Sequence, residues 1–376
     1  MQKHVICAMS GGVDSSVAAA LLKKQGYKVT GVFMRFWHEK NNKTCATNRC
    51  CSQDSFDSAR LVCQKLGIKL YSLNCEKEFK KYVVDYFLDS FKKGLTPNPC
   101  IACNKYIKFG FFFRKLLEFD ADYLATGHYV KVKSQKSKIK SNNSKVKNKL
   151  KIKNNYLLLT AKDKNKDQSY FLYNLNQKKL AKILFPIGNY LKPEVRKLAK
   201  KFNLPTAEKK ESQEICFIKE KNYHDFLKRN LKKIKPGKIK TVSGQTIGEH
   251  QGLCFYTLGQ RKGIGLGLEK TFYVAKLDFK HNILVVTDNP KDKLLFSKNI
   301  KLKNLNLIGE RPSLPYSCQI KIRSHASPVL GKIIKINKNE AHISLSSPAR
   351  AVMPGQSAVI YNKEVLIGGG VIAKTE

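Results

Sequence analysis

The strongest constraint on the fold of this chain is a glycine pair between two apolar runs near its N-terminus. The segment Ser10–Ser16 has the sequence Ser-Gly-Gly-Val-Asp-Ser-Ser. It follows the apolar run His4–Met9, which is typical of a buried strand. It precedes Val17–Gln25, whose composition is typical of a helix that ends at Gly26. Glycines let the backbone approach a ligand closely, and a helix N-terminus carries partial positive charge. The segment therefore predicts an anion-binding strand–turn–helix, with a plain polar turn as the alternative.

This loop differs from two other families of phosphate loop. It is not followed by the Gly-Lys-Ser/Thr of mononucleotide P-loops, and it lacks the Gly-x-Gly-x-x-Gly of dinucleotide-binding folds. The sequence of this loop resembles that of the pyrophosphate loop of N-type ATP pyrophosphatases. That resemblance implies an enzyme that splits ATP between the α and β phosphates and passes AMP to an oxygen of its substrate.

Composition bounds the class of protein and its partners. The chain has 376 residues, enough for two or three domains, and a formal charge of +43 from 71 Lys and Arg against 28 Asp and Glu. This excess favours a polyanionic partner such as nucleic acid, although a coding bias towards Lys and Asn is an alternative cause. The 11 cysteines, the absence of a secretory signal and the absence of an apolar run of ~20 residues predict a cytoplasmic protein without a membrane segment.

Alternating strand and helix patterns predict an α/β domain with a parallel sheet over residues 1–212. Beyond the first strand and helix, the expected strands are 29–34, 68–75 and 122–130, and the expected helices are 51–67, 77–94, 105–119, 177–184 and 193–202. Ligands bind such sheets at the carboxyl ends of the strands. Both the glycine loop and Thr126–Tyr129, which ends a strand, should therefore lie at one edge.

Three further segments complete the predicted organisation. Residues 131–155 contain ten lysines and no acid, which predicts a mobile basic loop that either contacts a polyanion or is a tolerated insertion. Residues 235–267 are rich in Gly and other turn-forming residues, which predicts a small central domain over residues 213–286. Residues 287–376 contain short β-rich runs and predict a C-terminal β-barrel.

A Cys-x-x-Cys pair, Cys100 and Cys103, follows two prolines. Cys103 falls just before a predicted helix, where the helix dipole and nearby lysines should lower the thiol pKa and favour a nucleophilic thiolate. The alternatives are a redox pair, or half of a zinc site completed by Cys45, Cys50 or Cys51.

A further cysteine, Cys216, lies in the segment 211–218 between a polar run and an apolar one. Taken alone it is equally consistent with an ordinary buried cysteine. However, an enzyme that adenylates an oxygen and then needs a sulfur nucleophile would place two cysteines near its ATP site. The glycine loop therefore favours a paired role for Cys103 and Cys216.

A series of motifs now points to one family. In chain order they are Ser-Gly-Gly-Val-Asp-Ser-Ser (10–16), Pro-Asn-Pro-Cys-x-x-Cys-Asn-Lys (97–105), Ala-Thr-Gly-His-Tyr (125–129), Lys-Asp-Gln-Ser-Tyr-Phe-Leu (166–172), Ile-Cys-Phe-Ile (215–218), Thr-Leu-Gly-Gln-Arg-Lys-Gly (257–263) and Pro-Gly-Gln-Ser-Ala-Val (354–359). Together they resemble the tRNA-specific 2-thiouridylases over nearly the whole chain.

The resemblance implies a tRNA-uridine 2-sulfurtransferase that replaces O2 of the wobble uridine in tRNAs for Lys, Glu and Gln by sulfur. ATP would adenylate O2, and the products would be 2-thiouridine, AMP and pyrophosphate. Cys216 would carry a persulfide received from a cysteine desulfurase or sulfur-relay protein. Cys103 would be the nucleophile that forms a disulfide with Cys216 as the sulfur leaves. The enzyme is expected to act as a monomer.

The resemblance also implies three sets of contact residues. ATP would contact Ala8, Met9, Ser10, Gly11, Gly12, Val13, Asp14, Ser15, Met34 and Gly127; the target base would contact Asn98, Pro99 and Cys100; tRNA would contact His128, Lys166, Asp167, Gln168, Arg323, Ser324 and Gln356. Mg²⁺ should accompany ATP, with Asp14 as a candidate ligand.

One position departs from part of the family. Some members carry Asp where this chain has Cys100, and a thiol with a reference pKa of about 8.5 is a poorer general acid or base at neutral pH than a tuned carboxylate. The acid–base role of this position is therefore open. Two rival functions are an amidotransferase-linked ATP pyrophosphatase acting on a small molecule and a non-catalytic, zinc-bearing RNA-binding module.

Overall fold

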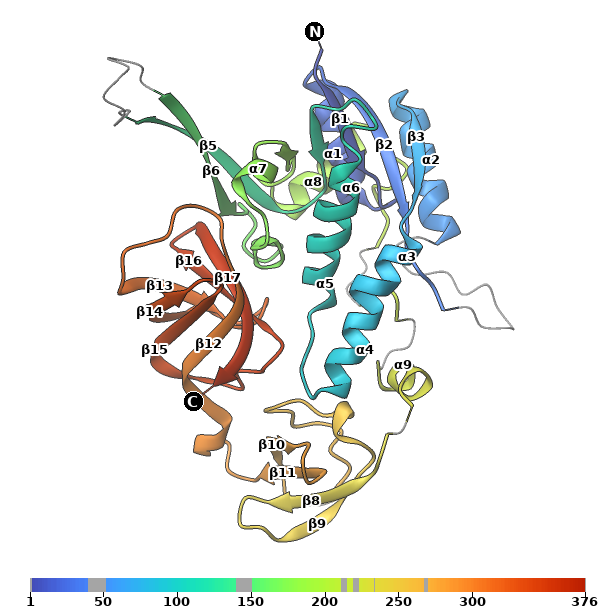
Figure 1. Ribbon diagram of the computed structural model, residues 1–376. Helices are drawn as coiled ribbons and strands as arrows, with labels where there is room; N and C mark the ends of the chain where they lie inside the picture. Colours follow the sequence, from blue (N-terminus) through green and yellow to red (C-terminus); the bar gives the residue numbers. More distant parts are fainter. Residues whose placement is uncertain are drawn as a thin grey trace.

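Figure 1 shows the computed structural model, which describes residues 2–39, 52–139, 151–210, 215–218, 223–232, 234–266 and 270–375. An N-terminal α/β part, a small central sheet and a C-terminal β-barrel follow one another along the chain. This order confirms the fold class predicted from sequence. No helix in the described ranges is long and apolar enough to cross a membrane.

A parallel sheet with strand order β3-β2-β1-β4-β7 forms the centre of the N-terminal part. Its strands are β1 (His4–Ala8), β2 (Lys28–Arg35), β3 (Leu70–Asn74), β4 (Tyr123–Ala125) and β7 (Ile183–Leu184). Alternate residues of β1 belong to different cores: Val5 and Cys7 to one, Ile6 and Ala8 to the other. An apolar run without polar alternation is what a strand covered on both faces requires.

Helices cover both faces of this sheet. The core that contains Val5 and Cys7 is shared with α1 (Val13–Lys24), α2 (Gln53–Leu66) and α8 (Lys192–Lys201). The opposite core is covered by two long helices that pack against each other, α3–η1–α4 (Glu76–Phe79, Lys80–Val84, Asp85–Lys92) and α5–η2–α6 (Pro99–Ala102, Cys103–Phe111, Phe112–Arg114). The middle segments η1 and η2 are π-helical.

The central sheet has the order β10-β11-β8-β9, and the barrel the order β12-β15-β14-β13-β16-β17 with β12 pairing back to β17. The central strands are β8 (Gly237–Thr241), β9 (Thr246–His250), β10 (Tyr273–Asp278) and β11 (Ile283–Thr287). The barrel strands are β12 (Phe296–Leu307), β13 (Tyr316–Lys321), β14 (Val329–Asn337), β15 (Glu340–Arg350), β16 (Ser357–Asn362) and β17 (Val365–Thr375). The β12–β17 pairing removes the open edges that an unclosed sheet would leave.

The remaining described elements are short. They are η3 (Ser169–Leu172), α7 (Gln177–Leu180), α9 (Tyr223–Asn230), η4 (Leu253–Phe255) and η5 (Lys293–Leu295).

The predicted basic loop over 131–155 is wrong for the residues that the structure describes. They form two antiparallel strands, β5 (Val130–Ile139) and β6 (Lys151–Thr160). The pairs run from Val130↔Thr160 to Ile139↔Lys151. In addition, β6 pairs with β17 of the barrel. Lysine-rich strands lack an apolar alternation, so the sequence carried no periodic signal, although cross-strand hydrogen bonds satisfy the backbone. Residues 140–150 lie outside the described part.

Other predicted elements differ in their limits. Helix α1 begins at Val13, so the second half of the glycine motif forms its first turn. The expected helix 177–184 is instead α7 followed by the sheet strand β7. The expected strand 122–130 is interrupted after β4, and residues 126–129 form a loop.

Candidate active site

A pocket of about 370 Å³ opens at the carboxyl ends of β1, β2 and β4. Its lining includes every position that the family resemblance implied for ATP: Ala8, Met9, Ser10, Gly11, Gly12, Val13, Asp14, Ser15, Met34 and Gly127. His128, Lys166 and Gln168, implied for tRNA, line the same pocket. The structure therefore brings the glycine loop and residues 126–129 together at the sheet edge where the sequence placed them, and adds the segments around residues 34 and 167.

The turn between β1 and α1 is held in a form that only glycine permits. Gly11 has φ +72°, and a Cβ there would lie 2.0 Å from the carbonyl oxygen of Ser55. Ser15 Oγ accepts from the backbone N–H of Ser10 at 3.2 Å and donates to the Gly12 carbonyl at 3.0 Å. Gly12 is the N-cap of α1, and no side chain caps this helix. The first turn of α1 therefore presents its backbone amides to the pocket, as an anion site requires.

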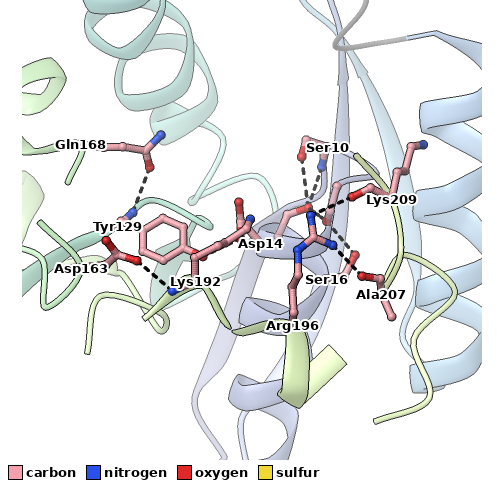
Figure 2. Close-up of polar contacts among 12 residues, drawn as sticks. Ser10, Asp14, Ser16, Tyr129, Asp163, Gln168, Lys192, Arg196, Ala207 and Lys209 are labelled. Carbon is pink, nitrogen blue, oxygen red and sulfur yellow. Dashed lines mark hydrogen bonds and ion pairs between the residues drawn. The ribbon is translucent and has the colours of Figure 1, made fainter. Parts of the chain in front are cut away.

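Asp14 is the acidic residue in the pocket lining, and two donors hold it (Figure 2). Lys192 Nζ lies 2.7 Å from Asp14 Oδ1, and Tyr129 Oη donates to the same oxygen at 2.8 Å. Lys192 is buried at the start of α8, and its backbone N–H donates to Asp163 Oδ2 at 2.9 Å. The positive charge of Lys192 therefore compensates the charge of the Asp14 carboxylate, and the bonds from Lys192 and Tyr129 fix its orientation in the pocket.

Basic side chains line the pocket beyond the predicted set. Lys108, Lys209 and Lys210 line it together with Lys166. Arg196 donates to the Ala207 carbonyl at 2.8 Å and to the Lys209 carbonyl at 3.3 Å (Figure 2). In addition, Lys209 Nζ lies 2.8 Å from Asp54 Oδ2. These bonds hold the 207–209 segment against the sheet edge. Sequence reasoning missed Lys108, Lys209 and Lys210 because isolated lysines carry no signal in so basic a chain.

His128 is a buried, neutral member of the site. Burial, and then the neighbouring Lys108 ammonium, holds the pKa of His128 well below its usual range. Lys108 Nζ lies 3.5 Å from Nε2, and Thr126 Oγ1 lies 2.8 Å from Nδ1. An ammonium can only donate, so Nε2 accepts, and the ring proton sits on Nδ1 facing Thr126.

The adjacent residues Asp167 and Gln168 bind different partners. Gln168 Oε1 accepts from the backbone N–H of Tyr129 at 2.9 Å, which links the 166–168 turn to the loop after β4 (Figure 2). Asp167 accepts from the Ala161 backbone N–H at 2.9 Å and from Ser169 Oγ at 2.7 Å. Asp167 therefore organises its own turn, while Gln168 reaches the pocket.

Cys103 does not precede a helix, as the sequence had suggested, but lies inside one. The helix begins at Pro99, and the Asn98 side chain caps it by accepting from the Ile101 backbone N–H at 3.2 Å. The N-terminal turn therefore contains the exposed Cys100, while Cys103 is buried. In the π-helical η2, which begins at Cys103, hydrogen bonds join residues five apart. Lys108, which lines the pocket, is thus one turn beyond Cys103.

Cys216 lies in the described segment 215–218, half-buried against the core that contains Cys103. Its neighbour Phe217 contacts Phe79 with ring centroids 5.9 Å apart, and Phe79 stacks on Phe36 at 4.7 Å. Phe36 itself lines the pocket. A chain of aromatic contacts therefore connects the Cys216 segment to the pocket, although neither cysteine belongs to the lining. Residues 211–214 of the predicted motif lie outside the described part.

Of the barrel residues predicted for tRNA contact, Gln356 holds the loop that precedes Cys100, whereas Arg323 binds carbonyls of the barrel itself. Gln356 Nε2 donates to the carbonyls of Thr96 at 3.2 Å and Pro97 at 3.3 Å, and the Thr96 backbone N–H donates to the Pro354 carbonyl at 2.9 Å. Arg323 donates to the carbonyls of Arg350 and Ala351 at 2.9 and 2.8 Å. Ser324, next to it, is partly exposed. The barrel thus fixes the position of the Asn98–Cys100 turn.

The zinc alternative finds no support in the described residues. No group of three or more His, Cys, Asp or Glu side chains that could hold a metal ion occurs within them. Cys45, Cys50 and Cys51, named above as possible ligands, lie outside the described part.

Comparison with family models matches the three parts of the chain in order. Residues 3–220 match a model described as tRNA methyl transferase HUP domain, residues 224–288 a tRNA methyl transferase PRC-barrel domain, and residues 297–372 an aminomethyltransferase beta-barrel domain. The domain limits expected from sequence, 1–212, 213–286 and 287–376, stay predictions.

Full-length relatives decide the family. A protein of Proteus mirabilis named tRNA-specific 2-thiouridylase MnmA is 43% identical over 99% of this chain and 97% of its own length. The chain belongs to the tRNA-specific 2-thiouridylase family. Other members with the same name are 44% identical in Buchnera aphidicola, over 98% of this chain and 96% of the relative, and 42% identical in Carboxydothermus hydrogenoformans, over 99% and 98%.

Proposed function

We propose that this protein is the tRNA-uridine 2-sulfurtransferase of its family: it uses ATP to convert the wobble uridine of tRNAs for Lys, Glu and Gln to 2-thiouridine. The observation that carries the proposal is the pocket itself. It combines the Gly11–Gly12 turn, the α1 N-terminus and the lysines Lys108, Lys209 and Lys210. Of these lysines, Lys108 lies one helical turn beyond Cys103. An anion site beside a thiol is what adenylation followed by sulfur transfer needs.

The first step activates a poor leaving group. Uracil O2 attacks the α phosphate of ATP, pyrophosphate leaves, and the O2–AMP group makes C2 electrophilic. The α1 N-terminus and the pocket lysines stabilise the charge that develops on the phosphates. Magnesium would neutralise further phosphate charge; Asp14 could ligate it through Oδ2, because Lys192 and Tyr129 both bind Oδ1.

The second step transfers sulfur. A persulfide on Cys216, received from a cysteine desulfurase or relay protein, attacks C2 through its terminal sulfur, and AMP leaves with O2. The Cys103 thiolate then attacks Cys216 Sγ; the sulfur–sulfur bond breaks, its electron pair forms the C2 thiocarbonyl, and a Cys103–Cys216 disulfide remains. A thiol reductant must restore both thiols for the next turnover. The aromatic contacts of Phe217 with Phe79, and of Phe79 with Phe36, support a Cys216 position near the pocket.

The target base must leave its stack to reach this site. Asn98, Pro99 and Cys100 form the helix turn that would receive it, and Gln356 positions that turn from the barrel. The charge of +43 supplies attraction to the RNA backbone, which would engage Lys166, Arg323 and Ser324. We further propose that the protein acts as a cytoplasmic monomer.

The proposal predicts the outcome of one assay. The purified protein, incubated with ATP, Mg²⁺, a cysteine desulfurase with cysteine as persulfide source, a thiol reductant and unmodified tRNA for Lys, should form 2-thiouridine, detected by nucleoside mass spectrometry, with equimolar AMP and pyrophosphate. A tRNA with cytidine at the wobble position is the matched control and should give no thiolated product. Release of AMP without any thiolated nucleoside would contradict the proposal, as would stoichiometric zinc bound through Cys100 and Cys103.

Gly127→Ala should weaken ATP binding by about 10²-fold, the scale expected for a displacement of about 1 Å in a positioned site. A Cβ at Gly127 would lie 2.7 Å from the Ser15 backbone nitrogen and 2.8 Å from the Asp14 carbonyl carbon, so it must push the first turn of α1. Calorimetric titration with ATP measures the effect. Gly309→Ala is the control glycine substitution, because nothing lies within 4 Å of a Cβ there and its φ is not in the left-handed region. ATP affinity equal to wild type in Gly127→Ala would refute the expectation.

A further inference from the structure

Two tyrosines on neighbouring π-helical segments form an exposed aromatic stack. Tyr82 in η1 and Tyr106 in η2 have ring centroids 4.9 Å apart and an interplanar angle of 16°. They remain 37% and 39% exposed. Lys81 Nζ lies 5.3 Å from the Tyr82 centroid and Lys105 Nζ lies 5.0 Å from the Tyr106 centroid. The surface therefore combines stacked rings with cations held at ring distance.

The stack forms one wall of a cavity of about 210 Å³, where the two long helices meet the barrel. Tyr86 and Tyr173 add aromatic surface, and Asn98, Asn174 and Asn304 add amide groups. This volume lies below the roughly 300–1,000 Å³ of pockets for drug-sized ligands. Flat aromatic walls with a few amides suit one planar, hydrogen-bonding ring better than a larger ligand.

This cavity is separate from the thiol face of the same helix. Asn98, Ala102 and Tyr106 line it at intervals of four residues, so they share one helix face. Cys100 and Cys103 do not line it and are offset by two and one residues from Asn98 and Ala102. The cavity and the two thiols therefore belong to the same helix, at neighbouring positions of the chain.

The charge around the cavity points to an anionic ligand. Burial, and then repulsion from Arg114 and Lys105, lowers the pKa of Lys179. Lys81 and Lys105 line the cavity, and their ammonium groups therefore place two positive charges beside the tyrosine stack. A polymer of planar bases joined by phosphates satisfies the rings, the amides and the cations at once.

We propose that the cavity and the Tyr82–Tyr106 stack form a second base-binding site, which holds an unpaired nucleotide of the RNA loop that delivers the target uridine to the thiol face. The site rests on the proposed function, because it requires an RNA substrate. The base stacks on the tyrosines and its edge meets the amides of Asn174 and Asn304, while Lys81 and Lys105 bind the flanking phosphates. Binding a neighbouring nucleotide holds the loop open and keeps the target base out of its stack.

The test compares tyrosine variants in binding to the isolated anticodon stem–loop RNA of a lysine tRNA, measured by fluorescence anisotropy. The Tyr82→Ala/Tyr106→Ala protein should bind at least about tenfold more weakly than wild type, as the loss of a base–aromatic stack implies. Tyr82→Phe/Tyr106→Phe keeps the rings and should stay within about twofold of wild type. ATP affinity should be unchanged in both, which shows that the fold is intact.

Two controls separate the outcomes. Tyr71→Ala removes a tyrosine of similar exposure, 47%, from the edge strand β3 and should leave stem–loop binding unchanged. Equal binding by wild type and the double alanine variant would overturn the base site, as would an equal loss on a fully paired duplex, which offers no unstacked base. If wild type binds the stem–loop through the tyrosines but makes no 2-thiouridine, the proposed function fails and the base site stands.

Discussion

Cys216→Ser is expected to abolish 2-thiouridine formation, with a loss of at least about 10³-fold, while ATP affinity stays at the wild-type value. Serine has nearly the same size, but its hydroxyl cannot carry the transferred sulfur. Cys216 does not line the ATP pocket, so nucleotide binding has no reason to change. The assay is nucleoside mass spectrometry after incubation with ATP, tRNA, a cysteine desulfurase with cysteine and a thiol reductant, with ATP titration alongside. Cys103→Ser should show the same pattern, because each thiol is needed for the disulfide.

Matched cysteine controls make this result specific. Cys318→Ser changes a buried barrel cysteine, whose burial raises its thiol pKa to about 11 and keeps it protonated, and it should retain thiolation. Cys100→Ser tests the position whose acid–base role the sequence left open. Substantial thiolation by Cys216→Ser would exclude a persulfide on this residue and would point to direct attack by sulfide on the adenylated base.

Lys192→Met should lower ATP affinity by about 10²-fold and the free energy of unfolding by about 1–3 kcal/mol. The Lys192 side chain is 9% exposed and that of Asp14 30% exposed, and their charged atoms lie 2.7 Å apart. Removing one partner of a fully buried pair costs about 3–5 kcal/mol; the exposure of Asp14 reduces this value. An uncompensated Asp14 carboxylate would also repel the phosphates of ATP. Urea unfolding and calorimetric titration measure the two effects.

A double mutant and a surface control test the cause. Lys192→Met with Asp14→Asn removes both charges, so it should recover part of the lost stability relative to Lys192→Met alone. Lys162→Met breaks a more exposed ion pair, Lys162–Glu194 at 3.0 Å, and should change stability by less than about 1 kcal/mol. ATP affinity unchanged in Lys192→Met would show that Asp14 does not need its lysine to admit the nucleotide.

Parts of the site could be predicted from sequence because their geometry is local. The Gly11–Gly12 turn needs a positive φ at Gly11 and a close approach to Ser55, and glycine is visible in the sequence as the residue that permits both. The carboxyl-end rule for parallel sheets then placed Gly127 and His128 beside it, as the pocket confirms. By contrast, the N-terminal turn expected at Cys103 lies at Asn98, because proline at the first helical position extends the helix towards the N-terminus.

The sequence by itself determined the α/β sheet, the anion-binding turn and the family, since these depend on hydrophobic periodicity and on contiguous motifs. Only the tertiary structure decided which lysines matter. Lys192 reaches Asp14 across 178 positions of the chain, and Lys108 and Lys209 reach the same pocket from separate segments. It also decided that the basic stretch after Tyr129 pairs as β5 and β6 and joins the barrel. The residues next to a lysine in the sequence do not show whether it lies on a solvated surface or in a pocket. Its location depends on contacts between segments that are far apart in the chain, and no local sequence pattern predicts these contacts.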